Sequence, residues 1–208
     1  MITTRAELSF YIAADRMMNR GTFHYAIKQK IKDFIKPDYI MRFLVHMRKC
    51  AYFRNTGGGI LHKALYIYHL LKYQKLGIRL GFSIGYNVFG YGLVIPHYGT
   101  IVVGETNHCG NYAVLHTSTC ISDNGKVIGD GLYLSTGAKI TSNLKLGNNI
   151  SIGANSMVNK SITKDNVLIA GQPASIIKDS EPWYIRDGRT YEERVRQVEE
   201  LHNQLKQY

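Results

Sequence analysis

The sequence is poor in cysteine and has no long apolar run. It holds only three cysteines in 208 residues, Cys50, Cys109 and Cys120. An odd number of widely spaced cysteines argues against a disulfide framework and is typical of a reducing compartment. No stretch approaches the roughly 18 uninterrupted apolar residues of a membrane-spanning helix, and the N-terminus lacks the pattern of a signal peptide. We therefore expect a cytoplasmic protein.

Acidic residues are scarce in the first third of the chain. Residues 1–76 hold 14 Lys and Arg against 4 Asp and Glu, whereas residues 77–208 hold 12 against 11. The net charge of +11 therefore belongs almost entirely to the N-terminal segment. Such a segment can be a helical cap with solvated charges or a surface for an anionic membrane, and these two alternatives stay open. Because no nucleic-acid motif accompanies the charge, we expect no nucleic-acid partner.

The N-terminal segment carries helical patterns and the breaks between them. Pro37 interrupts one pattern and the run 57–59, which is all glycine, interrupts another. We expect four helices, near residues 5–18, 22–35, 38–53 and 60–76. At the other end of the chain, residues 180–208 are expected to form an exposed tail with one amphipathic helix. Its apolar positions are Val195, Val198, Leu201 and Leu205.

Between residues 78 and 173 an aliphatic residue recurs every six positions, with glycine beside it in many cases. A strand alternates with period two and a helix with period 3.6, so neither element alone explains the spacing. A parallel β-helix does, because three short strands make one triangular coil of roughly 18 residues. A β-sandwich is the alternative that the regular spacing argues against. The inward positions are Val103, Cys109, Leu115, Ile121, Ile128, Leu134, Ile140, Leu146, Ile152 and Val158.

The six-residue repeat is interrupted twice. Ile95 and Val103 are eight residues apart, and Ile121 and Ile128 are seven residues apart. Extra residues in a solenoid are extruded as loops, often on the face that binds. Because the rest of the repeat is regular, we expect function at these two extrusions, residues 96–100 and 123–126.

The first interruption resembles the active-site stretch of serine acetyltransferases. Residues 92–106 place a histidine shortly before the sequence Ile-Val-Val-Gly-Glu-Thr, as in that family. Similar stretches follow at residues 115–126, 134–140, 152–158 and 170–174. The chain thus resembles the hexapeptide-repeat acyltransferases over about residues 79–178. Its helical start and its His-Tyr-Gly variant look most like the members that acetylate sugars of capsules, O-antigens or exopolysaccharides.

The resemblance implies a fold, a co-substrate and an assembly. The fold is a left-handed parallel β-helix of about five coils at residues 77–178, between a helical segment, 1–76, and a helical tail, 179–208. The co-substrate is acetyl-CoA, and the assembly is a homotrimer or a pair of trimers with the active site between neighbouring prisms. The acceptor is a sugar hydroxyl of a surface polysaccharide, with serine as the alternative. Such sugars are assembled at the inner membrane. Binding to anionic lipid there would be a suitable role for residues 1–76.

The match also implies site residues. His97 corresponds to the general base, which removes the hydroxyl proton as the acceptor attacks the thioester. His116, nineteen residues later and about one coil along, is a second catalytic candidate, with a surface role as the alternative. A backbone amide near Ser122 or Asp123 would hold the thioester oxygen. The match implies that small residues line the pantetheine arm, namely Ser135, Thr136, Gly153 and Ala154. It implies that lysines bind the nucleotide phosphates, namely Lys160 or Lys164.

Three departures from the serine acetyltransferase pattern weaken the case for serine. Pro96 and Phe82 replace two aspartates, and the loop with a second histidine is missing after Lys126. Glu105 or a backbone carbonyl remains as the group that orients His97. The spacing of the histidines does not match a zinc-binding β-helix, so we expect no metal. A membrane-bound trimeric scaffold without affinity for acetyl-CoA is the alternative from another class.

Overall fold

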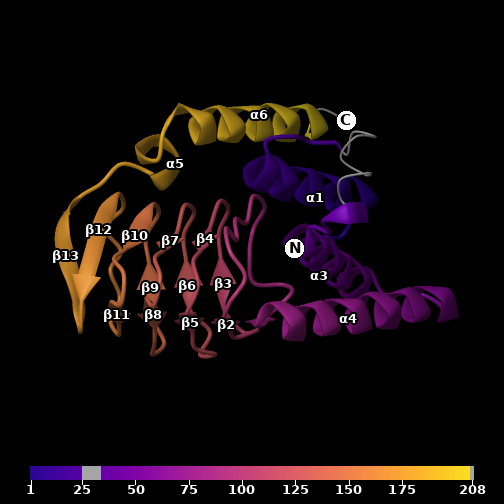
Figure 1. Ribbon diagram of the computed structural model, residues 1–208, viewed down its shortest axis with the longest axis horizontal. Coiled ribbons are helices and arrows are strands. Elements are labelled where there is room, and N and C mark those ends of the chain that lie inside the picture. The colour runs from indigo at the N-terminus through magenta and orange to yellow at the C-terminus, as the bar shows by residue number, and fades with distance from the viewer. Residues whose placement is uncertain (25–33, 207–208) are drawn as a thin grey trace.

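The protein consists of a helical segment, a β-helix and two C-terminal helices, as Figure 1 shows. A computed structural model describes residues 1–24 and 34–206. The helices are α1 (Arg5–Arg20), α3 (Tyr39–Thr56), α4 (Ile60–Leu80), α5 (Trp183–Arg186) and α6 (Arg189–Leu205). The strands are β1 (Phe82–Ile84), β2 (Ile101–Val103), β3 (His108–Cys109), β4 (Val114–Leu115), β5 (Thr119–Ile121), β6 (Val127–Ile128), β7 (Tyr133–Leu134), β8 (Lys139–Ile140), β9 (Lys145–Leu146), β10 (Ile150–Ile152), β11 (Met157–Val158), β12 (Val167–Gly171) and β13 (Ala174–Asp179).

Three parallel sheets form the sides of a prism of about five coils, which confirms the predicted left-handed β-helix. We call the sheet of β1, β2, β5, β8 and β11 face A, the sheet of β3, β6 and β9 face B, and the sheet of β4, β7, β10 and β12 face C. Equivalent residues of successive coils pair directly, for example Val103 with Ile121 and Ile121 with Ile140. At the far end β13 pairs antiparallel with β12, a hairpin that the six-residue repeat does not predict.

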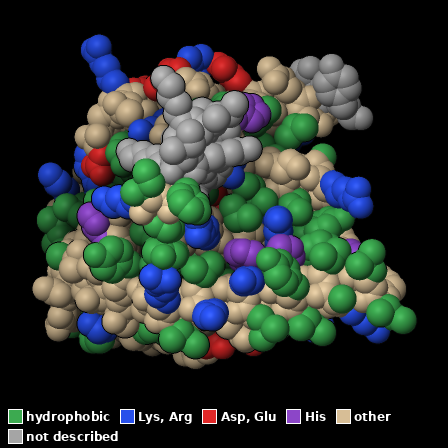
Figure 2. All heavy atoms as spheres, turned by 45° about the vertical axis from the view of Figure 1, so that its right-hand side comes forward, with side chains coloured by type: hydrophobic (Ala, Val, Ile, Leu, Met, Phe, Trp, Pro, Cys, Tyr) green, Lys and Arg blue, Asp and Glu red, His purple; other side chains and the backbone are tan. Residues whose placement is uncertain are grey.

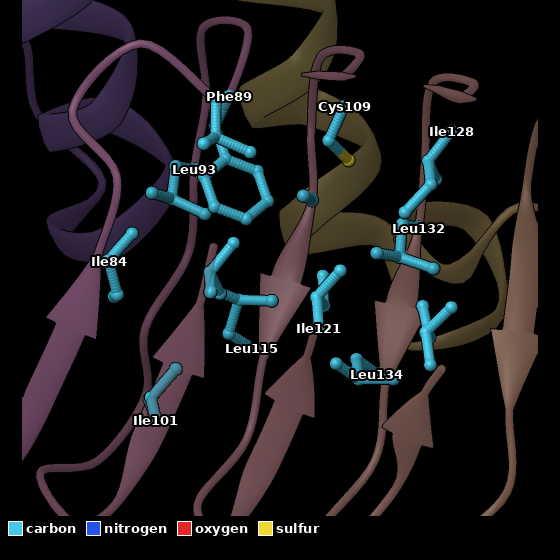
Figure 3. Packing of buried hydrophobic residues seen from close by; sticks show 14 of the residues in the cluster. Ile84, Phe89, Leu93, Ile101, Cys109, Leu115, Ile121, Ile128, Leu132 and Leu134 are labelled. Atoms are coloured by element: carbon cyan, nitrogen blue, oxygen red, sulfur yellow. The ribbon is translucent and has the colours of Figure 1, made fainter. Parts of the chain in front are cut away.

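The aliphatic residues of the repeat form the core of the prism. None of the ten predicted inward residues exceeds 5% exposure, so each coil contributes its apolar side chains to one continuous interior. Figure 3 shows part of this core, with Leu115, Ile121 and Leu134 among the side chains that point into the space between the strands. Cys109 belongs to this core, where burial raises the pKa of its thiol. It is therefore a small buried hydrophobe, as the repeat predicts.

The helical segment follows its predicted breaks, with one boundary displaced. The expected helices near 5–18 and 38–53 are present as α1 and α3, whereas the one near 22–35 falls largely outside the described residues. Helix α4 continues to Leu80, so the first strand begins at Phe82 and not near Ile78. A Cβ at Gly77 would lie 2.8 Å from the Phe82 carbonyl oxygen, so this glycine permits the helix to pack closely against the first strand.

A buried ion pair joins α1 and α3 to the first coil. The Arg48 guanidinium donates to both Asp15 carboxylate oxygens, at 2.7 and 3.0 Å. It also donates to the Phe89 and Gly90 carbonyl oxygens, at 2.7 and 2.6 Å. Asp15 in turn accepts from the Leu93 amide at 3.0 Å. Because both side chains are 1% exposed, this network fixes the helices on the β-helix through groups that water does not reach.

The C-terminal residues are not an exposed tail, so that part of the sequence prediction is wrong. The predicted amphipathic helix is present as α6, but it packs against α1, and Val198 is fully buried. Trp183 of α5 is also buried and its indole N–H donates to the Tyr112 carbonyl oxygen at 2.8 Å. The apolar stripe of α6 thus covers aromatic residues at the edge of face C. The helical spacing predicts the stripe but does not identify the surface against which it packs.

Two histidines between α3 and α4 predict a loss of stability in acid. His46 and His69 approach through their Nδ1 atoms at 2.8 Å, and burial, with the nearby Lys49 charge, lowers the pKa of His69 to about 4. In the unfolded chain His69 binds a proton below about pH 6.5, whereas in the folded protein it binds one only near pH 4. The contribution of His69 to the free energy of unfolding is therefore fully present above pH 6.5 and is lost as the pH falls towards 4. We expect a loss of about 2 kcal/mol across this window.

Urea unfolding of the wild type and of His69→Gln, each near neutral pH and in mild acid, checks this expectation. The variant is expected to lose less stability on acidification than the wild type. His108→Gln is the matched control, because His108 is exposed on face B. An equal acid sensitivity in wild type and His69→Gln would show that another group is responsible.

Candidate active site

Successive coils place equivalent residues in a column at the edge where face C turns into face A, which we call the CA corner. The His116 amide donates to Leu134 at 3.0 Å, the Ser135 amide to Ile152 at 3.2 Å and the Gly153 amide to Ile169 at 2.8 Å. These three bonds put His116, Ser135 and Gly153 at the same position of consecutive coils. Thr136 and Ala154 follow one residue further and are exposed. The structure therefore brings five of the predicted site residues to one edge.

His97 lies in the loop above this column. Residues 96–100 leave the prism as the sequence predicts, and the His97 side chain is exposed, outside the core. The Gly99 amide donates to the Leu80 carbonyl oxygen at 2.9 Å, which fixes the loop to the end of α4. A Cβ at Gly99, where φ is +144°, would lie 3.1 Å from the Thr117 side chain, so the loop closely approaches the next coil. His97 is thus held at the CA corner by backbone contacts.

His116 is a neighbour of His97, as the spacing predicts. Its ring is half-buried, and its Nε2 atom lies 2.9 Å from the Tyr133 hydroxyl. Burial lowers the pKa of His116, the nearby His97 lowers it further, and Asp187 opposes both. The imidazole of His116 is therefore neutral near pH 7, and its unprotonated Nε2 accepts a hydrogen bond from Tyr133 when the proton is on Nδ1.

Three residues at this corner escaped the sequence analysis. The Arg186 guanidinium lies 4.6 Å from the centre of the Tyr133 ring and donates to the Ser151 hydroxyl at 2.9 Å. It also pairs with Asp187 at 2.8 Å. Arg186 and Asp187 come from the C-terminal segment, and Tyr133 occupies an outward position of the repeat. Only the fold brings them beside His116, so no spacing in the sequence could have found them.

Neither Phe82 nor Glu105 orients His97. Phe82 is buried and packs edge-to-face on Phe43 of α3, with ring centres 5.2 Å apart, so it anchors the helices to the first coil. Glu105 lies beyond the other end of β2, where a Cβ on Gly85 would be 2.6 Å from the Glu105 Cα atom. Among residues 1–24 and 34–206, no side chain hydrogen-bonds the His97 imidazole.

A pocket of about 450 Å³ lies against His97. Its walls are the last turn of α1, the first turn of α3 and the His97 loop, and its charged lining residues are Arg16, Arg20, Lys36 and Asp38. Arg20 donates to both oxygens of the Asp38 carboxylate, at 2.5 and 2.8 Å. Burial raises the pKa of Asp38, but the bonds from Arg20 and the Met41 amide outweigh burial and keep the pKa below its usual value. Among the described lining residues the charges are thus mostly positive, and the Asp38 carboxylate is engaged by Arg20.

The second extrusion lies at another edge, where face A turns into face B. The Ser122 amide donates to the Ile140 carbonyl oxygen at 3.0 Å, so it belongs to the ladder and is not free to act as an oxyanion donor, whereas the alternative, the Asp123 amide, stays a prediction. The Asp123 carboxylate accepts from the Thr106 amide and hydroxyl, at 2.8 and 2.5 Å. The Lys126 amine is buried and donates to the Ser122 carbonyl oxygen at 2.5 Å. These contacts give the loop a structural role within one chain.

The two predicted lysines also lie away from the CA corner of their own chain. Lys160 is exposed after β11, at the edge between faces A and B. Lys164 is at the edge between faces B and C, where its ammonium pairs with Asp179 at 2.6 Å. Neither lysine therefore joins the CA corner column within one chain. Among the described residues there is no cluster of three or more His, Cys, Asp or Glu side chains that could hold a metal ion.

Comparison with known proteins shows the fold. No protein-family model matches the chain, and no curated protein matches its sequence. Its fold is similar to solved serine acetyltransferases. The Neisseria gonorrhoeae enzyme matches with 20% identity and a TM-score of 0.60 over 86% of this chain and 69% of that one. The soybean apoenzyme matches with 19% identity and a TM-score of 0.61 over 82% and 69%. A serine acetyltransferase in complex with CoA matches with 20% identity and a TM-score of 0.54 over 82% and 67%.

Proposed function

We propose that this protein is an O-acetyltransferase that uses acetyl-CoA, with His97 as its general base. The observation that carries the proposal is the position of His97, extruded and exposed at the head of the CA corner column. The residues below it, Ser135, Gly153 and Ala154, are small, and we expect an extended pantetheine arm to lie along them. The structural likeness to serine acetyltransferases, one of them solved with CoA, supports the same assignment.

The proposed reaction is a direct transfer in a ternary complex. His97 removes the proton from the acceptor hydroxyl as its oxygen attacks the thioester carbonyl carbon. The carbonyl oxygen becomes negatively charged and needs a hydrogen-bond donor. The C–S bond then breaks, the acetyl ester is released, and the imidazolium returns the proton to the CoA thiolate. A neutral His116 beside His97 adds no positive charge that would oppose the proton transfer.

Two acceptors remain, and each has an observation in its favour. Serine is supported by the neighbours, which are serine acetyltransferases and include one solved in complex with serine. An acidic sugar is supported by the pocket at His97. A serine ammonium needs an acidic partner, but among the described lining residues the acid is Asp38, and Arg20 donates to both of its oxygens. Lys36 lines the same pocket and attracts a carboxylate or phosphate. We therefore propose an acceptor that carries an anionic group, such as a uronic acid or a sugar phosphate.

A thiol-release assay with acetyl-CoA compares the acceptor classes directly. The panel contains serine, a neutral sugar, a uronic acid and a nucleotide sugar, each at the same concentration. CoA release with the acidic sugars above that with serine supports the proposed acceptor. Preferential release with serine assigns the protein to serine acetylation, and the absence of release with every acceptor argues against the enzyme.

Replacing Lys36 should weaken acceptor binding without affecting the co-substrate. We expect Lys36→Glu to raise the KM for an acidic acceptor by about tenfold, since a charge-assisted hydrogen bond is lost and a repulsion replaces it. The KM for acetyl-CoA should not change, because Lys36 lies in the pocket and not in the CA corner column. Lys178→Glu on β13 is the matched control, because Lys178 is exposed far from His97. An unchanged acceptor KM in Lys36→Glu would remove the pocket from the acceptor site.

A further inference from the structure

Helix α4 has an apolar stripe on the side that faces away from the protein. Its inner side buries His69, Gly77 and Leu80 against α3 and the first coil. The outer side carries aliphatic residues at intervals of three, four and seven, which places them on one face. Two of them, Ile60 and Ile78, are 90% and 85% exposed. The stripe consists of Ile60, Ala64, Ile67, Leu71 and Ile78.

The charge that α4 itself carries is entirely positive. Helix α4 contains no Asp or Glu in its 21 residues. Its cationic residues stand on both sides of the stripe, and in Figure 2 hydrophobic and basic side chains mix along the lower part of the molecule, where α4 lies. Lys72 also lies 5.7 Å from the ring centre of Tyr68, an exposed aromatic residue on the same side. The four cationic residues are Lys63, Lys72, Lys75 and Arg79.

The described acids of the helical segment do not neutralise this charge. Asp15 is buried against Arg48, Asp38 is paired with Arg20, and Glu7 caps the first turn of α1. A second copy that presented the same helix would bring like charges together, which opposes self-association through α4. The surface instead matches a partner that is apolar in its interior and anionic at its boundary. A bilayer with anionic headgroups has both properties.

We propose that α4 lies in the surface of an anionic membrane, with its stripe among the upper acyl chains and its lysines among the headgroups. Basic amphipathic helices bind membranes in this way, in the plane of the interface. Figure 1 shows α4 along an outer edge of the molecule, so a flat surface reaches it without crossing the β-helix. Among the described residues, no helix is long and apolar enough to cross a bilayer, in keeping with surface binding. This proposal does not depend on the acetyl transfer.

Vesicle sedimentation with the full chain tests the proposal. The protein should sediment with vesicles of phosphatidylcholine mixed with phosphatidylglycerol, remain in solution with phosphatidylcholine alone, and detach at high salt. Leu71→Glu should lower the affinity about tenfold, because it removes an inserted side chain and adds a negative charge. Lys72→Gln with Lys75→Gln should lower it about fivefold for each lysine while keeping the stripe intact.

Ile177→Glu is the matched control, because Ile177 is an aliphatic residue of similar exposure on β13, at the far end of the prism. It should bind vesicles as the wild type does. Equal binding to neutral and anionic vesicles, or no loss in Leu71→Glu, would overturn the proposal. A change of oligomeric state in Leu71→Glu, measured by sedimentation velocity, would also overturn it and would show that α4 contacts another copy of the chain.

Discussion

Replacing His97 with alanine is expected to lower the rate of acetyl transfer by about 10²–10⁴-fold, the usual contribution of a positioned general base. The expectation follows from geometry, because His97 is the exposed imidazole at the head of the CA corner column and borders the pocket. The loop is held by backbone contacts of Gly99 and Ile101, so the substitution removes the base without releasing the loop. The loss should therefore appear in kcat, whereas the affinity for CoA should stay near that of the wild type.

The matched control for this experiment is His108→Ala. His108 is exposed like His97 but lies on face B, at the start of β3. Its loss should leave the rate unchanged. If His97→Ala transfers acetyl at a rate close to that of the wild type, the base is another group, and His116 becomes the next candidate because its ring is a neighbour at the same corner.

Replacing Asp15 with alanine is expected to lower the free energy of unfolding by about 3–5 kcal/mol, the largest stability effect that the structure predicts. The substitution leaves the Arg48 charge buried and without its carboxylate, and the Leu93 amide loses its acceptor. Such a charge cannot reach water, because the Arg48 side chain is 1% exposed. Chemical denaturation measures the loss.

Two further variants separate the cost of an unpaired charge from the contribution of the pair. Asp15→Leu combined with Arg48→Met removes both charges and should be more stable than Asp15→Ala alone. Asp179→Ala breaks the exposed pair with Lys164 and should cost less than about 1 kcal/mol. If Asp15→Ala were no more harmful than Asp179→Ala, the network would not hold the helices on the prism.

The β-helix could be predicted from the sequence because each inward residue repeats the environment of the residue one coil earlier. Ile121 pairs with Val103 on one side and with Ile140 on the other, so a single spacing specifies the whole ladder. The same regularity made the interruption at His97 visible. In a repeat of this kind the spacing along the sequence determines which residues are neighbours in successive coils. The contacts between coils can therefore be predicted from the sequence alone.

The contacts that the sequence did not reveal join segments with no common period. Asp15 and Arg48 belong to different helices, and Arg186 reaches Tyr133 from beyond the end of the prism. The burial of Val198 depends on α1, which an amphipathic pattern does not identify as its partner. The bond of the Ser122 amide is a similar case, because only the register of the ladder shows that this amide is already engaged.

The most direct test of the central claim is a calorimetric titration of the full-length protein with CoA. If the CA corner below His97 receives acetyl-CoA, saturable binding should be seen at micromolar concentrations of ligand and should persist in His97→Ala. The absence of any binding at high micromolar CoA would contradict the claim and leave the β-helix as a scaffold without this chemistry.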